Sequence, residues 1–141
     1  MRKIVKRLMV IIFLALTFVG VYWFAIHPNS YKYDTAIKNG DVVMWAGGLV
    51  NLDKFHAFIK NMENKQPEKI RITAFSKEEY PAVFDLDFYG ENIKCTTDNT
   101  RDLYGRDCTK KYGEYTKITK NEINFHILVD ETGKYQDTWL F

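Results

Sequence analysis

The sequence is poor in residues that bind transition metals, with two cysteines and three histidines among 141 residues. The histidines lie far apart, and none stands at a ligand spacing from either cysteine (His27, His56 and His126; Cys95 and Cys108). Structural zinc sites need four such ligands at characteristic spacings. We therefore expect no metal site and no metal cofactor.

Catalytic motifs are also missing from the sequence. No serine or cysteine nucleophile is paired with a histidine in a recognisable pattern. Gly47 and Gly48 lack the strand–GxGxxG–helix setting of a nucleotide site, so no other cofactor is indicated. We therefore expect a non-catalytic protein.

Neither sign of charge is in strong excess. The chain has 20 Lys and Arg against 18 Asp and Glu, a net charge of +2. Four of the basic residues precede an apolar run near the start, which leaves 16 against 18 in residues 27–141. Binding of nucleic acid needs a basic face on the folded domain, so a nucleic-acid partner is not expected.

The longest uncharged run is Leu8–Ile26, LMVIIFLALTFVGVYWFAI. A helix of this length covers roughly 28 Å, close to the hydrocarbon thickness of a bilayer. Basic residues precede it in a short tail, residues 1–7, and basic flanks stay in the cytoplasm. We predict an uncleaved transmembrane signal-anchor at 8–26 with the lipid bilayer as its partner. The chain is then a single-pass protein of the cell membrane, with its C-terminal domain outside the cytoplasm.

The alternative for this run is a cleaved secretory signal peptide. Cleavage needs small residues at the first and third positions before the cut, and a cut after Ala25 places Trp23 at the third position. No cysteine follows the run to take a lipid. In both cases we expect a linker at 27–33 and one extracytoplasmic domain at 34–141.

The domain begins with helical periodicity and continues with strand periodicity. Asn51 is a candidate cap for a helix that ends before Pro67, and its apolar residues recur at helical spacing (Leu52, Phe55, Phe58, Ile59 and Met62). Apolar and polar residues then alternate in 69–75, 82–89, 92–98 and 123–129. We predict an α+β fold with a mainly antiparallel meander sheet of five or six strands, covered by that one amphipathic helix.

The alternation also predicts the register of the first strands. A two-residue turn at Gly90 and Glu91 pairs Phe88 with Ile93, and therefore Asp87 with Lys94. The preceding hairpin, set to match apolar faces, pairs Arg71 with Asp85 and Lys69 with Asp87. One face of the sheet is then apolar and the other carries pairs of opposite charge.

The only two cysteines lie in a segment expected to be outside the cytoplasm, where disulfides persist. We predict a bond between Cys95 and Cys108 that ties the third of these strands to the loop after it. Closing about 14 residues should stabilise the fold by roughly 3 kcal/mol. The alternative is a buried free thiol at Cys95, beside Leu86.

One polar cluster is dense enough to suggest a binding site: Asp98, Asn99, Thr100, Arg101 and Asp102. Its oxygens could bind a cation, but the spacing of a calcium loop and its closing Glu are missing. Its side chains could instead build a turn by bonding to nearby backbone, with Arg101 paired to either Asp. We keep the five residues as candidate contacts for a partner or ligand.

Asp85 and Asp87 place two carboxylates on one face of a strand, a pattern that can hold a divalent cation or perform acid–base chemistry. The predicted register gives both of them basic neighbours across the strands. We therefore interpret them as members of a solvated, charge-paired face.

Several strings resemble one known family: AIKNGDVV at 36–43, the helix pattern after Asn51, KIRI at 69–72, and above all DNTRD at 98–102. They are similar to the family catalogued as domain of unknown function 4362, over roughly residues 34–118. The resemblance implies a small extracytoplasmic protein of Bacillus-type bacteria, most members being lipoproteins or anchored proteins. It implies no activity and no catalytic residues.

The function that we expect is a binding or accessory module of the cell envelope, membrane-anchored, non-catalytic and of unknown ligand. Its partner would be an envelope protein or a secreted protein. The alternative is an immunity- or inhibitor-type protein that occupies a secreted toxin or hydrolase.

Overall fold

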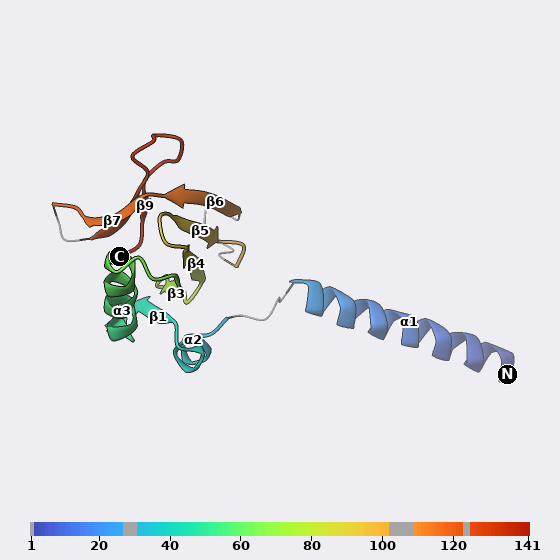
Figure 1. Ribbon diagram of the computed structural model, residues 1–141. Coiled ribbons are helices and arrows are strands. Elements are labelled where there is room, and N and C mark those ends of the chain that lie inside the picture. The colour runs from blue at the N-terminus through green and yellow to red at the C-terminus, as the bar shows by residue number, and fades with distance from the viewer. Residues whose placement is uncertain (1, 27–30, 102–108, 123–124) are drawn as a thin grey trace. The chain divides into compact units, whose positions relative to one another are not determined.

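The computed structural model describes residues 2–26, 31–101, 109–122 and 125–141 (Figure 1). The chain divides into two compact units, Met1–Ser30 and Tyr31–Phe141.

The first unit contains one helix, α1 (Arg2–Ile26). Over the described part of the chain, no helix has both the length and the apolar character needed to cross a membrane. The transmembrane signal-anchor predicted at 8–26 is therefore wrong, and the single-pass location at the cell membrane that depended on it is not supported.

The second unit is built on a six-stranded sheet with the order β2-β1-β3-β4-β5-β6. Its strands are β1 (Val42–Trp45), β2 (Gly48–Val50), β3 (Glu68–Phe75), β4 (Pro81–Phe88), β5 (Ile93–Asp98) and β6 (Lys110–Tyr115). From β3 to β6 the strands follow one another as an antiparallel meander. The alternation predicted β3, β4 and β5, but it did not predict a strand at 110–115. Before them, β1 and β2 form a hairpin, and β1 pairs with β3 in parallel, which the predicted meander did not include.

The last three strands form a separate sheet with the order β7-β8-β9, and not the end of the same meander. They are β7 (Lys117–Lys120), β8 (His126–Val129) and β9 (Thr138–Trp139). The chain changes sheets at Thr116, whose backbone N–H donates to the Val129 carbonyl at 2.9 Å. The Thr116 hydroxyl donates to the same carbonyl at 3.1 Å, which ties the end of β6 to β8.

Helix α3 (Leu52–Glu63) packs its apolar stripe on the sheet, as its periodicity predicted. Phe55 and Phe58 are buried in a core that also takes side chains from both sheets. Asn51 precedes the helix in the left-handed conformation, with φ 58°, and makes no side-chain cap bond. Its side-chain amide instead donates to the Asp41 carbonyl at 2.8 Å. The prediction that the Asn51 side chain caps the helix is therefore wrong.

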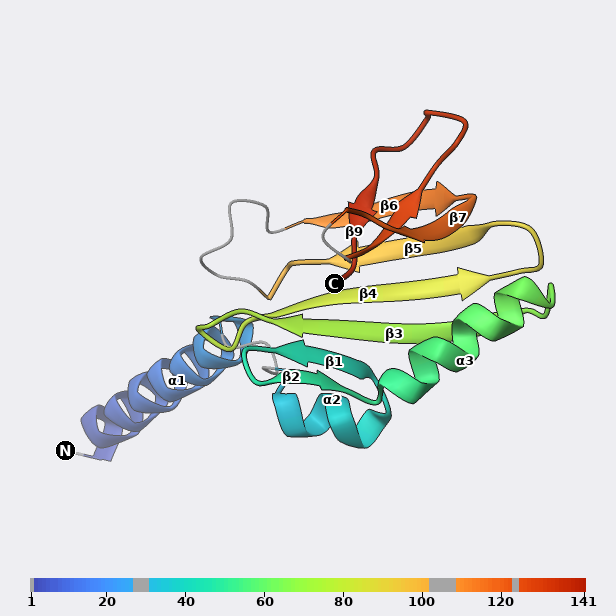
Figure 2. The same ribbon diagram turned by 90° about the vertical axis from the view of Figure 1, so that its left-hand side faces the viewer.

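The two faces of the six-stranded sheet have different cover. Figure 1 shows α3 and the second sheet on one side, and the short helix α2 (Tyr33–Asn39) on the other. Tyr33 of α2 packs on Trp45 and Phe75, with ring centroids at 5.2 and 6.0 Å. These contacts place α2 over β1 and one end of β3. Figure 2 shows the six strands side by side, with β4, β5 and β6 on the side of β3 away from β1.

Candidate functional site

The side of the sheet that carries α2 has a row of alternating charges across β3–β6. Lys69, Asp87, Lys94 and Glu114 are consecutive cross-strand partners. The Lys69 ammonium lies 2.7 Å from an Asp87 carboxylate oxygen. The pairing of Lys69 with Asp87 and of Asp87 with Lys94 confirms the register predicted from the sequence.

A second row lies beside the first and consists of Arg71, Asp85, Thr96 and Tyr112. Arg71 donates to both oxygens of Asp85, from Nε at 2.6 Å and from Nη2 at 3.0 Å. The hydrogen bond to Asp85 is the main reason that the pKa of Arg71 is raised, so its charge is permanent. This pair also confirms the predicted register.

The end of the first row is held by an aromatic residue of the β4–β5 turn. The Lys94 ammonium lies 4.6 Å from the centroid of the Tyr89 ring. The Tyr89 hydroxyl donates to Glu114, and the Asn92 amide donates to the same carboxylate oxygen at 3.4 Å. Sequence reasoning did not place Tyr112 and Glu114 here, although the alternation of Lys110, Tyr112 and Glu114 is a signal that could have done so.

Both rows line a groove of about 900 Å³. Asn39 and Asp41, at the end of α2, contribute to its lining, and so does Tyr135 from the β8–β9 loop. Tyr112 is the most exposed aromatic side chain of the lining, with 73% of its surface accessible. The groove thus combines paired charges with an uncovered aromatic ring.

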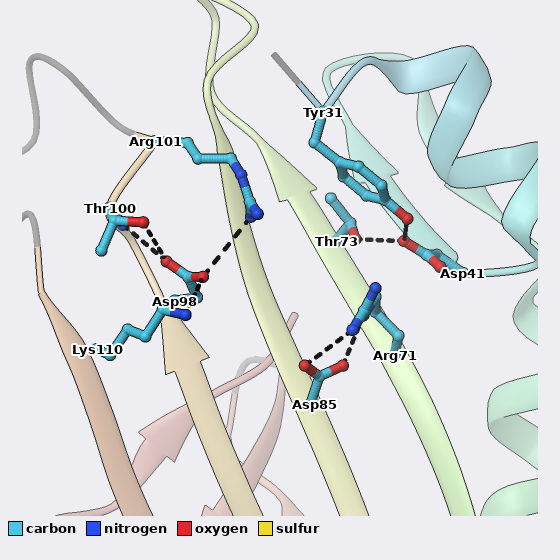
Figure 3. Close-up of polar contacts among 9 residues, drawn as sticks. All are labelled: Tyr31, Asp41, Arg71, Thr73, Asp85, Asp98, Thr100, Arg101 and Lys110. Atoms are coloured by element: carbon cyan, nitrogen blue, oxygen red, sulfur yellow. Dashed lines mark hydrogen bonds and ion pairs between the residues drawn. The ribbon is translucent and has the colours of Figure 1, made fainter. Parts of the chain in front are cut away.

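The predicted binding cluster begins where β5 ends, and Asp98 organises it (Figure 3). One carboxylate oxygen of Asp98 accepts from the Thr100 backbone at 3.0 Å and from the Thr100 hydroxyl at 2.6 Å. The other oxygen lies 3.2 Å from the Lys110 ammonium and 3.7 Å from Arg101. Burial acts to raise the pKa of Asp98, but the hydrogen bonds from Thr100 and the charge of Lys110 outweigh it and lower the pKa. Asp98 and Thr100 therefore build a turn.

Asn99 and Asp102 are two further residues of the predicted binding cluster. The Asn99 backbone donates to the Thr109 carbonyl at 3.1 Å, while its side-chain oxygen is buried without a hydrogen bond. Asp102 lies outside the described residues. None of the cluster residues that the structure describes lines the groove.

Arg101 connects the turn to a polar cluster under α2 (Figure 3). Its guanidinium lies 5.8 Å from the centroid of the Tyr31 ring. The Tyr31 hydroxyl donates to Asp41 at 2.7 Å, and the buried Thr73 donates to the same oxygen at 2.7 Å. Tyr31 and Asp41 come from a segment 60 or more positions before Arg101, so no local sequence pattern could have revealed this arrangement.

Cys95 is a free thiol, and the predicted disulfide with Cys108 is wrong. The alternation of β5 turns Cys95 to the covered side of the sheet, where it is 3% exposed and opposite Leu86. Burial raises the pKa of the Cys95 thiol to about 11. Cys108 lies outside the described residues. The structure thus shows the alternative that the sequence had left open, a buried thiol beside Leu86.

The other candidate chemical groups do not converge. Within the described ranges, no group of three His, Cys, Asp or Glu side chains could hold a metal ion. His56 is exposed on α3, and His27 lies outside the described residues. His126 packs against the rings of Phe55 and Phe141, with centroids at 4.8 and 5.0 Å. Burial is the main reason that the pKa of His126 is lowered.

Comparison with known protein families gives a match over most of the sheet domain. The sequence profile of the family described as Domain of unknown function (DUF4362) matches residues 39–126. This segment includes α3 and all strands of the six-stranded sheet. No curated protein and no solved structure matches the chain.

Proposed function

This chain belongs to the family of domain of unknown function DUF4362, and we propose that its sheet domain is a non-catalytic module that binds another protein. The binding surface is the charged face, defined as the two rows Lys69, Asp87, Lys94, Glu114 and Arg71, Asp85, Thr96, Tyr112. The observation that carries the proposal is the groove that these eight residues line.

The composition of the charged face supports a protein partner. Tyr and Arg side chains dominate the binding energy of protein interfaces, and Arg71 and Tyr112 stand at the two ends of the second row in the groove. Arg71 is held in one orientation by its fork on Asp85, so little conformational entropy is lost when a partner arrives. Alternating charges favour a partner with the matching pattern and repel others.

The same contacts argue against catalysis at this face. Acid–base catalysis needs a titratable group that is free to exchange protons with a substrate. Asp85 and Asp87, the carboxylates at the centre of the groove, are each engaged in an ion pair. Lys69 and Arg71 serve as their partners, so the four groups neutralise one another.

Arg101 extends the proposed surface at one end. The turn built by Asp98 and Thr100 fixes the backbone from which Arg101 projects, and the ring of Tyr31 supports its guanidinium. Asp98 and Thr100 therefore affect binding indirectly, because they hold Arg101 in position. We expect Arg101→Ala to weaken binding of a partner while the melting temperature changes little.

Site-specific photo-crosslinking in the producing cells tests the proposal. A photoreactive amino acid replaces Tyr112 in one full-length variant and Lys60, exposed on α3, in the control. We expect one discrete protein adduct from position 112 that disappears when Arg71→Glu is added. Equal adducts from both positions, or none from position 112, would contradict the proposal. Mass spectrometry of the adduct distinguishes a secreted hydrolase or toxin, the partner of an inhibitor-type protein, from other partners.

A further inference from the structure

We infer that the protein covering the charged face is a second copy of this chain, bound face to face about a two-fold axis. This inference rests on the proposed function, because it names the partner of the same surface. The feature that carries it is the order of the charges along the first row.

The first row reads plus, minus, plus, minus from β3 to β6 (Lys69, Asp87, Lys94 and Glu114). A two-fold axis parallel to the strands, midway between β4 and β5, places β3 over the partner's β6 and β4 over the partner's β5. The row is antisymmetric about that axis. Lys69 then faces the partner's Glu114, and Asp87 faces the partner's Lys94. The symmetry repeats both contacts, as in any isologous dimer.

The second row obeys the same operation. Arg71 faces the partner's Tyr112, and a guanidinium over a tyrosine ring is a favourable contact. Asp85 faces the partner's Thr96, whose hydroxyl can donate to a carboxylate. Tyr112, most of whose surface is open to solvent in the single chain, thereby gains a partner.

The shape of the domain permits this approach. Helix α2 lies over β1 and one end of β3, near the edge of the sheet that is opposite to β6. The two-fold axis carries the part of α2 over β1 to a position beyond the partner's β6. The part over β3 contacts Phe75, which lies past Thr73 and outside both rows, so α2 does not stand between the facing rows. Sheets that pack face to face lie about 10 Å apart, a gap that two opposed long side chains span.

The net charge of the face also favours a copy over a strongly charged partner. The first row carries two positive and two negative groups, and Arg71 and Asp85 add one of each. A uniformly acidic or basic partner would meet as much repulsion as attraction. A surface that is neutral in sum and antisymmetric in order is complementary to itself.

Mixing of charge-reversed full-length chains tests the inference. Lys69→Glu places a carboxylate opposite the partner's Glu114, and Glu114→Lys places an ammonium opposite the partner's Lys69. We expect each variant alone to associate about tenfold more weakly than the wild type, which corresponds to roughly 1.4 kcal/mol. In a mixed dimer of the two variants, both contacts between positions 69 and 114 again join a carboxylate to an ammonium, so association should return toward the wild-type level. Co-capture of differently tagged copies measures all four pairings.

The control variants are Lys60→Glu and Glu63→Lys on α3, at the other side of the sheet, which should associate as the wild type does. Association through any other surface, α1 included, would be equal in every pairing and would overturn the inference. Failure of wild-type copies to associate would also overturn it. If Tyr112 then still gives an adduct with a different protein, the proposed function stands without it; if Tyr112 gives no adduct, both are wrong.

Discussion

Arg71 and Asp85 face each other across β3 and β4 in a two-pronged contact, with Nε 2.6 Å from one carboxylate oxygen and Nη2 3.0 Å from the other. The two side chains are 45% and 47% exposed, so water screens the attraction. The contact therefore fixes geometry more than it adds stability. It holds a guanidinium in place at the β3 end of the charged face.

A double-mutant cycle at Arg71 and Asp85 tests the register of β3 and β4. We expect Arg71→Glu to destabilise the domain by about 0.5–1 kcal/mol, because it sets two carboxylates opposite each other. Adding Asp85→Arg should recover part of that loss by restoring an opposite-charge pair. Urea unfolding of the four proteins gives the coupling free energy. Additive effects of the two substitutions would contradict a direct contact.

The sequence predicted the register of β3, β4 and β5 because alternation leaves only one arrangement that keeps apolar residues together. A slip of one residue would turn Leu86 and Ile93 outward and Asp85 inward. The turn at Gly90 adds a second, independent constraint, and Gly90 indeed has φ 104°. Alternation of this kind is sufficient to predict the register when each of the two strands has one covered face and one exposed face.

The β1–β2 hairpin and the cluster under α2 could not be predicted in this way. Val42, which joins the core with Phe55, and its neighbour Val43 are both fully buried, so β1 shows no alternation. Its parallel partner β3 follows only after a whole helix. Tyr31, Asp41 and Thr73 meet over separations of 10 and 32 residues, which no local motif encodes. The change of sheet after β6 depends on hydrogen bonds that are equally non-local.

The turn at Asp98 should contribute to the stability of the domain in a pH-dependent way. The folded-state pKa of Asp98 lies below its ordinary value of 3.8, so the unfolded chain binds this proton more tightly. The stabilisation is fully present above that ordinary value and is lost as the pH falls through the folded-state pKa. We expect Thr100→Val to cost about 1 kcal/mol near neutral pH and less in acid, because it removes the hydroxyl donor.

Urea unfolding of Thr100→Val and wild type between about pH 7 and about pH 3 measures this difference. Thr96→Val, on β5 with Asp98 but outside the turn, is the matched control and should leave the acid dependence unchanged. A constant difference between Thr100→Val and wild type at all pH values would show that the hydroxyl does not act through the Asp98 carboxylate.

Cys95 should be unreactive in the folded protein. Burial raises the pKa of its thiol to about 11, so very little thiolate is present near neutral pH, and the side chain is covered by the core. We expect iodoacetamide to modify Cys95 only as fast as the domain unfolds, and at once in urea. Peptide mass spectrometry follows Cys95 separately from Cys108. Rapid modification of the native protein, or a peptide linked through Cys95, would contradict the free, buried thiol.

Phe55 and Phe84 should differ in their contribution to stability. Phe55 on α3 is fully buried and contacts the rings of His126 and Phe141. Phe55→Ala removes these contacts and leaves a cavity, so we expect it to cost about 3–5 kcal/mol. Phe84 on β4 is only partly buried at the margin of the core, and water can fill part of the space that its ring vacates. Phe84→Ala should therefore cost less, about half as much, because less apolar area of its ring is buried.

Thermal and urea unfolding of both variants give the comparison, with Leu86→Ala, fully buried on the same strand as Phe84, as the control for β4. If Phe84→Ala destabilises the domain as much as Phe55→Ala, the core covers the Phe84 ring more completely than the structure shows.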